Sequence, residues 1–331
     1  MQRIFVSHVA SISQTVLALP ALRALRHSLP NSHITIASSY AAADIVQLSH
    51  CANLVVPVSR SSEMTNPRAS YRSLKSLSAL RREHYDLTIE LQRNAEGGFA
   101  RWLAQIGSGK RHKKLLSQIR EVLLRKSLQQ KHTAQRYIEI LAEIGAHPID
   151  TEPRLYTDRA ADERIEQRLE KSGMLSSGLL VGIHPGAGRN KDHWSAENFT
   201  TVAAKLIHTL DARVLIFAGP NERGLARVMA KQLPAKRALA LESLSLPEMA
   251  SAMARLSVFI GNQSGPAHLA AAVGTPVVAV SLRHISHTND LLSRNHTLIR
   301  KETFEAITTD EVFEAACQLI KSNRAESLWA R

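Results

Sequence analysis

Three glycine-containing loops in the second half of the chain carry the residue types that bind phosphate and sugar groups. They span residues 184–191 (HPGAGRNK), 219–222 (GPNE) and 261–276 (GNQSGPAHLAAAVGTP). Small residues let the backbone approach a ligand closely, and each loop comes near the end of an apolar run that suits a buried strand. Together the loops predict a nucleotide diphosphate site, although each alone also fits an ordinary turn.

Charged side chains in two of these loops are of the types that bind the phosphate and ribose groups of a nucleotide. Arg189 and Lys191 supply positive charge for phosphate groups. Glu222 can accept hydrogen bonds from ribose hydroxyls.

The third loop predicts a strand, a glycine turn and a short helix. The apolar run at residues 256–260 ends at Gly261. Either Ser264 or Gly265 can cap a helix, and Pro266 fits its first position. The free N–H groups of that helix would face the end of the sheet, where they attract anions and phosphate in particular.

Other chemical motifs fail on spacing. Residues 107–110 (GSGK) resemble part of a phosphate-binding loop, but Ala104 and Arg111 stand where its pattern needs glycine and serine or threonine. His284 and His287 lack a third metal ligand nearby. The GxSxG and GxGxxG patterns are absent, which disfavours hydrolase and dehydrogenase functions.

Alternating strand-like and helix-like segments would position the loops. Strands are expected at residues 2–7, 32–39, 52–58, 85–91, 179–184, 212–218, 256–260 and 276–281. Helices are expected at residues 15–27, 41–48, 68–83, 97–106, 129–145, 158–172, 196–210, 222–233, 246–255 and 308–322. Because two prolines interrupt the alternation at residues 147–156, we expect an α/β chain of two doubly wound parallel-sheet (Rossmann-like) domains facing across a cleft. Ligands in such folds bind at the carboxyl ends of the strands.

The charge balance predicts attraction to polyanions. The 331 residues include 42 Lys and Arg against 29 Asp and Glu, a formal net charge of +13. Basic residues cluster at 68–82 and 110–131, where nucleic acid, an anionic membrane, a phosphorylated glycolipid or a solvated helix face would each account for them. Nucleic acid is not expected, because few aromatic residues, such as Tyr71 and Trp102, accompany the basic ones.

The chain shows no apolar run long enough to span a membrane and no signal peptide, so a cytoplasmic location is expected. Cys51 and Cys317 have no metal-binding spacing, and we expect buried, reduced thiols.

The ordered motifs resemble the heptosyltransferases of bacterial lipopolysaccharide core assembly, glycosyltransferase family 9. The resemblance covers nearly the whole chain. It is carried by Ser11 and residues 19–23 (LPALR), 85–87 (YDL), 91–92 (LQ), 184–187 (HPGA), 219–222 (GPNE), 244–246 (LSL) and 264–271 (SGPAHLAA).

This resemblance implies a GT-B fold and an inverting transfer of heptose, or a related sugar, from ADP-heptose to a Kdo or heptose residue on lipid A core, without metal or cofactor. Residues 1–155 would bind the glycolipid acceptor and residues 156–331 the nucleotide sugar, and the last helix could pack back on the first domain. The enzyme would work peripherally at the inner face of the inner membrane, and its partners would be the donor, the glycolipid and the anionic membrane surface.

By position, the resemblance also implies a set of site residues. Donor-binding residues would be His184, Gly186, Ala187, Arg189, Lys191, Glu222, Gln263, Ser264, Gly265 and His268. Acceptor-binding residues would be Ser11, Ser13 and Arg60. A core histidine on a short helix remains the other interpretation of His268.

Two departures from the family pattern affect the expected chemistry. Gln14 and Gln263 stand where the family usually has aspartate, and the first of these aspartates is the expected general base. An amide has no useful basicity near neutral pH. His8, close in sequence to Gln14, is therefore a candidate substitute base. A catalytically impaired relative that binds nucleotide sugar or glycolipid is the alternative function.

Overall fold

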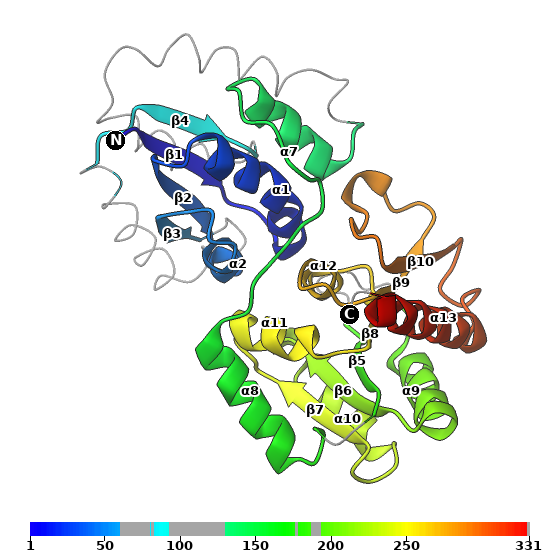
Figure 1. Cartoon of the computed structure of the whole chain (residues 1–331). Helices are drawn as coiled ribbons and strands as arrows, with labels where there is room; N and C mark the ends of the chain where they lie inside the picture. The colour runs from blue at the N-terminus through cyan, green and yellow to red at the C-terminus, as the bar shows by residue number, and fades with distance from the viewer. Residues whose placement is uncertain (60–79, 81–82, 93–129, 176–177, 187–192, 330–331) are drawn as a thin grey trace. The chain divides into compact units, whose positions relative to one another are not determined.

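The computed structural model describes residues 1–59, 80, 83–92, 130–175, 178–186 and 193–329. The predicted helices at residues 68–83 and 97–106 lie almost wholly outside these ranges, as do most of the basic clusters at 68–82 and 110–131. The chain divides into two compact units, Met1–Arg154 and Leu155–Arg331, and Figure 1 shows the elements of each.

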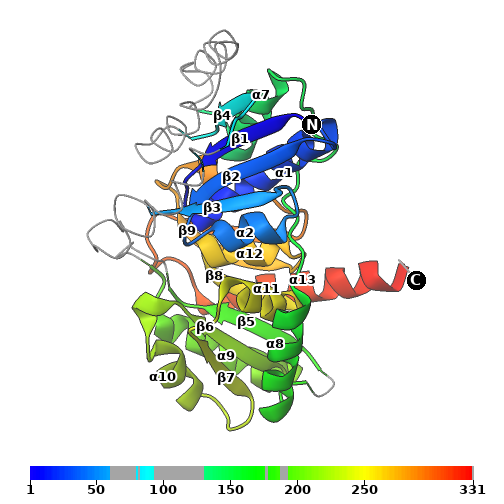
Figure 2. The ribbon, with the colours of Figure 1, turned by 90° about the vertical axis from the view of Figure 1, so that its left-hand side faces the viewer.

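A parallel sheet forms the centre of the first unit. Its described strands run in the order β3-β2-β1-β4 (Figure 2), and their bounds are β1 Arg3–His8, β2 His33–Ser39, β3 Leu54–Val58 and β4 Leu87–Glu90. The described helices are α1 Ile12–Ser28, α2 Ala43–Leu48 and α7 Thr133–Ala142. Apolar side chains of β1, β2 and β4 pack with those of α1 and α7 into one core cluster.

The second unit is built on a larger parallel sheet. Its described strands run in the order β10-β9-β8-β5-β6-β7, with bounds β5 Leu180–His184, β6 Arg213–Ala218, β7 Ala238–Glu242, β8 Val258–Asn262, β9 Val277–Leu282 and β10 His296–Lys301. The sequence analysis missed the two edge strands, β7 and β10. β10 (HTLIRK) lacks the continuous apolar run that marks β8 and β9. β7 (ALALE) has such a run, but it consists of alanine and leucine, which favour helices over strands.

The helices of the second unit are α8 Arg159–Lys171, α9 Ala196–Leu210, α10 Leu225–Lys231, α11 Leu246–Ala254, α12 Gly265–Ala272 and α13 Thr309–Trp329, with short 3₁₀ turns η2 Pro220–Glu222 and η3 His287–Asn289. The single helix predicted at residues 222–233 is wrong at its start. Gly224 has a φ of 85°, in the left-handed region, and this conformation separates η2 from α10.

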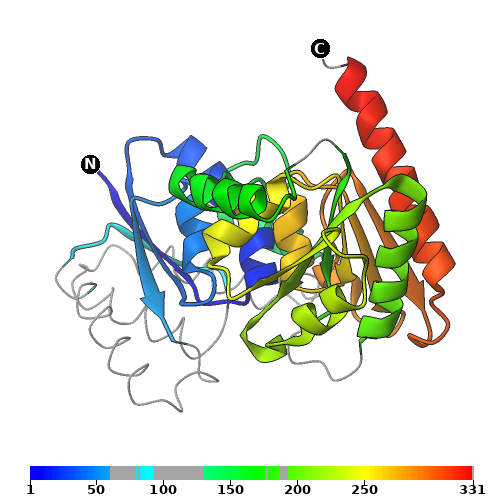
Figure 3. The ribbon, with the colours of Figure 1, turned by 90° about the horizontal axis from the view of Figure 1, so that it is seen from below.

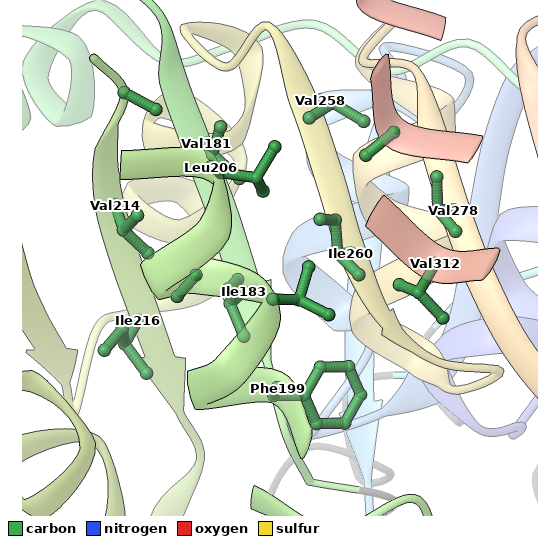
Figure 4. Packing of buried hydrophobic residues seen from close by; sticks show 14 of the residues in the cluster. Val181, Ile183, Phe199, Leu206, Val214, Ile216, Val258, Ile260, Val278 and Val312 are labelled. Atoms are coloured by element: carbon green, nitrogen blue, oxygen red, sulfur yellow. The ribbon is translucent and has the colours of Figure 1, made fainter. Parts of the chain in front are cut away.

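Helices α9 and α13 cover one face of the second sheet. Figure 4 shows Ile183 and Ile260 of the sheet directed toward Phe199 of α9 and Val312 of α13. Figure 3 shows α13 running beside β9 and β10, which it contacts. Burial of these side chains holds the carboxyl ends of the central strands in a fixed arrangement.

We expect Ile260→Ala to destabilise the second unit by about 2–5 kcal/mol, because the substitution leaves a cavity between β8 and the covering helices. Urea denaturation followed by circular dichroism measures the change. Val228→Ala is the matched control, since Val228 is an exposed aliphatic residue of α10. Equal shifts for the two variants would contradict the packing described.

Candidate functional site

The predicted loops of the second unit gather at one edge of its sheet. Because the strands are parallel, the segments that follow β5, β6, β8, β9 and β10 all leave from their carboxyl ends. Parallel α/β sheets bind ligands at this edge. Ala187, Arg189 and Lys191, three of the predicted donor-binding residues, lie outside the described residues.

Glu222 brings two of these loops together. Its Oε2 accepts a hydrogen bond of 2.9 Å from the Gly219 N–H and lies 3.4 Å from His184 Nε2. A Cβ atom on Gly186 would lie 1.9 Å from Glu222 Oε1, so the carboxylate occupies the space that any side chain at position 186 would need. The side chain of Glu222 is 14% exposed, which leaves part of the carboxylate at the surface.

The other ring nitrogen of His184 fixes the loop after β5. His184 Nδ1 lies 3.1 Å from the carbonyl oxygen of Gly186. The ring thus joins its own loop through Nδ1 and faces Glu222 through Nε2. Three residues predicted from the sequence to bind the donor, His184, Gly186 and Glu222, are therefore in mutual contact.

Asn262, at the end of β8, joins the backbone of Pro185 to that of Trp194. Its buried side chain donates from Nδ2 to the Pro185 carbonyl at 2.8 Å and accepts at Oδ1 from the Trp194 N–H at 3.0 Å. Trp194 is itself fully buried, and its Nε1–H donates to the Ile307 carbonyl at 3.0 Å. The sequence analysis did not assign Asn262 a role, although a polar residue directly after an apolar run could have indicated one.

The start of α12 adds backbone donors to the same edge. Ser264, one of the two cap residues that the sequence allows, is the N-cap residue, but its hydroxyl makes no capping hydrogen bond. Gly265 begins the helix, and the first-turn N–H groups have no intrahelical acceptor. His268 is buried within α12, and its backbone N–H donates to the Ser264 carbonyl at 3.3 Å.

Gln263 belongs to a polar cluster that the sequence analysis did not find. Its Nε2 donates to the Asn289 carbonyl at 3.2 Å and to Asp290 Oδ1 at 3.0 Å, and its Oε1 accepts from Arg300 Nη2 at 3.2 Å. Arg300 also forms an ion pair with Asp290.

The Asp290 carboxyl is ionised at neutral pH. Burial alone would raise the pKa of Asp290, but hydrogen bonds from Arg300, Gln263 and His287 together lower the pKa below its ordinary value. A carboxylate and a guanidinium therefore stand beside Gln263. This polar cluster was hard to predict from the sequence, because Asp290 lies in an irregular segment and Arg300 lies in an edge strand that was not predicted.

In the first unit, Gln14 is part of a helix cap. Ser11 Oγ accepts from the Gln14 N–H at 3.4 Å, and Gln14 Oε1 accepts from the Ser11 N–H at 3.5 Å, which is a reciprocal capping box. Gln92 Nε2 also donates to Gln14 Oε1 at 3.2 Å, and Ser13 Oγ lies 3.1 Å from Ser11 Oγ. The cap starts α1 at Ile12, earlier than the predicted start at residue 15.

His8, at the end of β1, is fully buried. Burial lowers the pKa of His8 to about 4, against a smaller raising effect of the nearby Gln14 backbone, so the ring is neutral at neutral pH. Its ring packs edge-on against Tyr137, with centroids 5.2 Å apart, and neither ring nitrogen is in hydrogen-bonding geometry with a described residue. For His8 to act as a base, the protein that covers it would have to open.

Two further residues belong to, or lie near, the part of the first unit for which the sequence predicts acceptor binding. Arg60 lies outside the described residues. Glu90, buried at the end of β4, brings a carboxylate to the same edge of the first sheet, and the sequence analysis did not single it out.

Within the part of the chain that the structure describes, no group of three or more His, Cys, Asp or Glu side chains could hold a metal ion. Of the described helices, none is long and apolar enough to cross a bilayer.

Comparison with known proteins identifies one group of relatives. The chain is 27% identical over 157 residues to lipopolysaccharide heptosyltransferase 3 of Escherichia coli, and this match spans 46% of the chain and 45% of that relative. The match thus covers less than half of the curated relative's length.

Solved structures share the fold over nearly the whole chain. A glycosyl transferase family 9 protein from Veillonella parvula superposes with a TM-score of 0.80 at 19% identity, over 97% of this chain and 98% of that one. The E. coli ADP-heptose lipopolysaccharide heptosyltransferase II gives a TM-score of 0.74 at 16% identity, over 98% and 100%.

The expected α/β fold of GT-B type, with two parallel sheets, is confirmed by this topology and these matches. The model of "Glycosyltransferase family 9 (heptosyltransferase)" matches residues 73–313, which is most of the chain. The protein therefore belongs to glycosyltransferase family 9.

Proposed function

We propose that the protein is an inverting glycosyltransferase that moves a heptose, or a related sugar, from a nucleotide sugar to a lipopolysaccharide core acceptor, with ADP-heptose as the first candidate donor. The observation that carries the proposal is the contact of Glu222 with Gly186 and His184 at the sheet edge where α12 begins. The names of the relatives support the choice of sugar and acceptor.

The proposed donor lies along the edge of the second sheet. Glu222 accepts hydrogen bonds from the ribose hydroxyls, because its carboxylate is partly exposed. The diphosphate lies near the first-turn N–H groups of α12, which favour negative charge. Arg189 and Lys191 remain the proposed source of positive charge for the phosphate groups.

The proposed acceptor is a lipid A core glycolipid that binds the first unit. The chain's net charge of +13 favours an anionic glycolipid and an anionic membrane surface. Work at the inner face of the inner membrane follows from this substrate. Ser11, Ser13 and Arg60 remain the proposed acceptor-binding residues.

A second candidate function is a catalytically impaired relative that binds nucleotide sugar or glycolipid. One observation favours it: the described side chains that hydrogen-bond to Gln14, namely Ser11 and Gln92, are a hydroxyl and an amide. Neither group takes up a proton near neutral pH. The donor site of such a protein would still bind its nucleotide.

Calorimetric titration with ADP, UDP and GDP, and then with ADP-heptose, tests the proposed function. We expect the protein to bind ADP selectively, because the relatives use an adenosine nucleotide. Selective binding of UDP or GDP would support the proposed nucleotide site but would mean that the donor carries a different nucleotide. Absence of binding to all of them would contradict the proposed donor site.

We expect Glu222→Gln to weaken nucleotide binding about 10-fold, because a hydrogen bond to a charged group contributes roughly 1.5–3 kcal/mol. Gly186→Ala should have a similar effect, since the new methyl group would displace the Glu222 carboxylate. Calorimetry measures both. Glu302→Gln is the control, because Glu302 is an exposed carboxylate paired with Arg283. If the Glu222→Gln protein bound the nucleotide with unchanged affinity, the assignment of Glu222 to the nucleotide site would be contradicted.

We expect Gln14→Asp to raise kcat about 10-fold or more with little change in the donor KM, because a positioned carboxylate base contributes a factor of roughly 10²–10⁴. Release of ADP from ADP-heptose, with Kdo-bearing lipid A as acceptor, gives both constants. Gln14→Asn is the matched control that changes length without adding charge. A fall in kcat for Gln14→Asp would show that the amide itself is needed.

A further inference from the structure

Four side chains of the first unit carry five buried polar atoms that have no hydrogen-bond partner among the described residues. They are His8 (Nδ1 and Nε2), Thr15 (Oγ1), Ser38 (Oγ) and Tyr137 (the phenolic oxygen). Each of the four residues is 0% exposed. Buried polar groups in folded proteins are nearly always paired with protein or with ordered water, so five such atoms in one unit point to a bound molecule.

Three of these residues meet on one face of the first sheet, at the carboxyl end of β1. His8 of β1 is in register with Ser38 of β2, and residues in register on parallel strands point to the same side of the sheet. Tyr137 of α7 packs edge-on against the His8 ring, with centroids 5.2 Å apart.

Thr15 reaches the same face from the first turn of α1. It precedes Ala18 and Leu22 by three and seven residues, a spacing that puts all three on one side of the helix, and Ala18 and Leu22 belong to the core cluster on the sheet. Burial lowers the pKa of His8, and the Gln14 backbone is near enough to act in the opposite direction. The residue before Thr15 therefore lies beside the His8 ring.

The chemistry of these atoms fits water. A neutral imidazole offers one donor and one acceptor, and each hydroxyl offers both, while a buried water molecule needs two to four partners of this kind. The guanidinium carbon of Arg136 lies 5.5 Å from the centroid of the Tyr137 ring, so positive charge near the cluster opposes a bound cation. Glu90 is in register with Ser7, the neighbour of His8, and so belongs to the opposite face of the sheet.

We infer that His8, Thr15, Ser38 and Tyr137 enclose an internal hydration site, in which ordered water joins the carboxyl end of β1 to the first turn of α1. That turn also contains Gln14, so the water helps to set where the capping box of α1 lies. The inference does not depend on the donor or the acceptor of the proposed function, because it concerns how α1 is held on the sheet.

A crystal structure at a resolution that shows ordered water tests which molecule occupies the site. We expect density for water within hydrogen-bonding distance of two or more of the five atoms. An ion there, or a side chain from another part of the chain, would overturn the hydration site.

Thr15→Val tests whether the water contributes to stability, because valine keeps the shape of threonine and removes the hydroxyl. We expect the melting temperature, measured by calorimetry, to fall by about 2–4 °C, the shift that the loss of one hydrogen bond gives in a domain of this size. Tyr137→Phe should give a similar fall. A dry site predicts the opposite sign, since removal of an unpaired buried hydroxyl relieves a cost.

Thr201→Val is the matched control, because Thr201 is an exposed threonine of α9, and we expect little change for it. A larger fall for Thr15→Val and Tyr137→Phe than for this control supports the hydration site. Variants that melt at or above the wild-type temperature would overturn it. Should the two variants disagree, Thr15→Val decides, because Tyr137 also contacts Arg136. Each of these outcomes leaves the proposed function to its own test by nucleotide titration.

Discussion

The hydrogen bonds of the Asn262 side-chain amide are the interactions on which the arrangement of the proposed donor site depends. Its Nδ2 donates to the carbonyl of Pro185 and its Oδ1 accepts from the N–H of Trp194. Because the amide is buried, each lost bond would leave a polar backbone group unpaired, at a cost of about 1–3 kcal/mol. Aspartate could accept from Trp194 but could not donate to Pro185. The position therefore needs both a donor and an acceptor on one short side chain.

The contact between Glu222 and Gly186 depends on that anchoring. The Glu222 carboxylate can lie against the loop after β5 because position 186 has no side chain. The loop is held in this position by the hydrogen bond from Asn262 of β8 to the Pro185 carbonyl. Three strands thus contribute to one site: β5 through its loop, β6 through η2, and β8 through Asn262. Parallel pairing brings these carboxyl ends together, which explains why residues about 40 apart in the sequence meet.

Local patterns predicted the fold and the glycine loops, whereas long-range contacts could not be read from the sequence. The buried strands β5, β8 and β9 have continuous apolar runs, and α9 has the expected bounds of residues 196–210. The pairing of Asp290 with Arg300 depends on an edge strand without such a run and on the path of an irregular segment, and neither has a local signature. The capping box of Ser11 and Gln14 does have one, a serine followed three residues later by glutamine, and it would have given the correct start of α1.

The two glutamines at positions where the family resemblance leads one to expect aspartate have different surroundings. Beside Gln263, Asp290 supplies a carboxylate within hydrogen-bonding distance, so negative charge is kept at that point and only its position in the chain differs. Beside Gln14, the described side-chain partners are Ser11 and Gln92, and neither is charged. A site that binds a nucleotide sugar needs acceptors for the hydrogen bonds of the sugar hydroxyls, and the Glu222 and Asp290 carboxylates are groups of that kind in the second unit. Proton transfer needs a group whose basicity matches the working pH, and a neutral amide in a helix cap lacks it. The surroundings of the two glutamines therefore differ: a carboxylate remains within hydrogen-bonding distance of Gln263, whereas the described side-chain partners of Gln14 are uncharged.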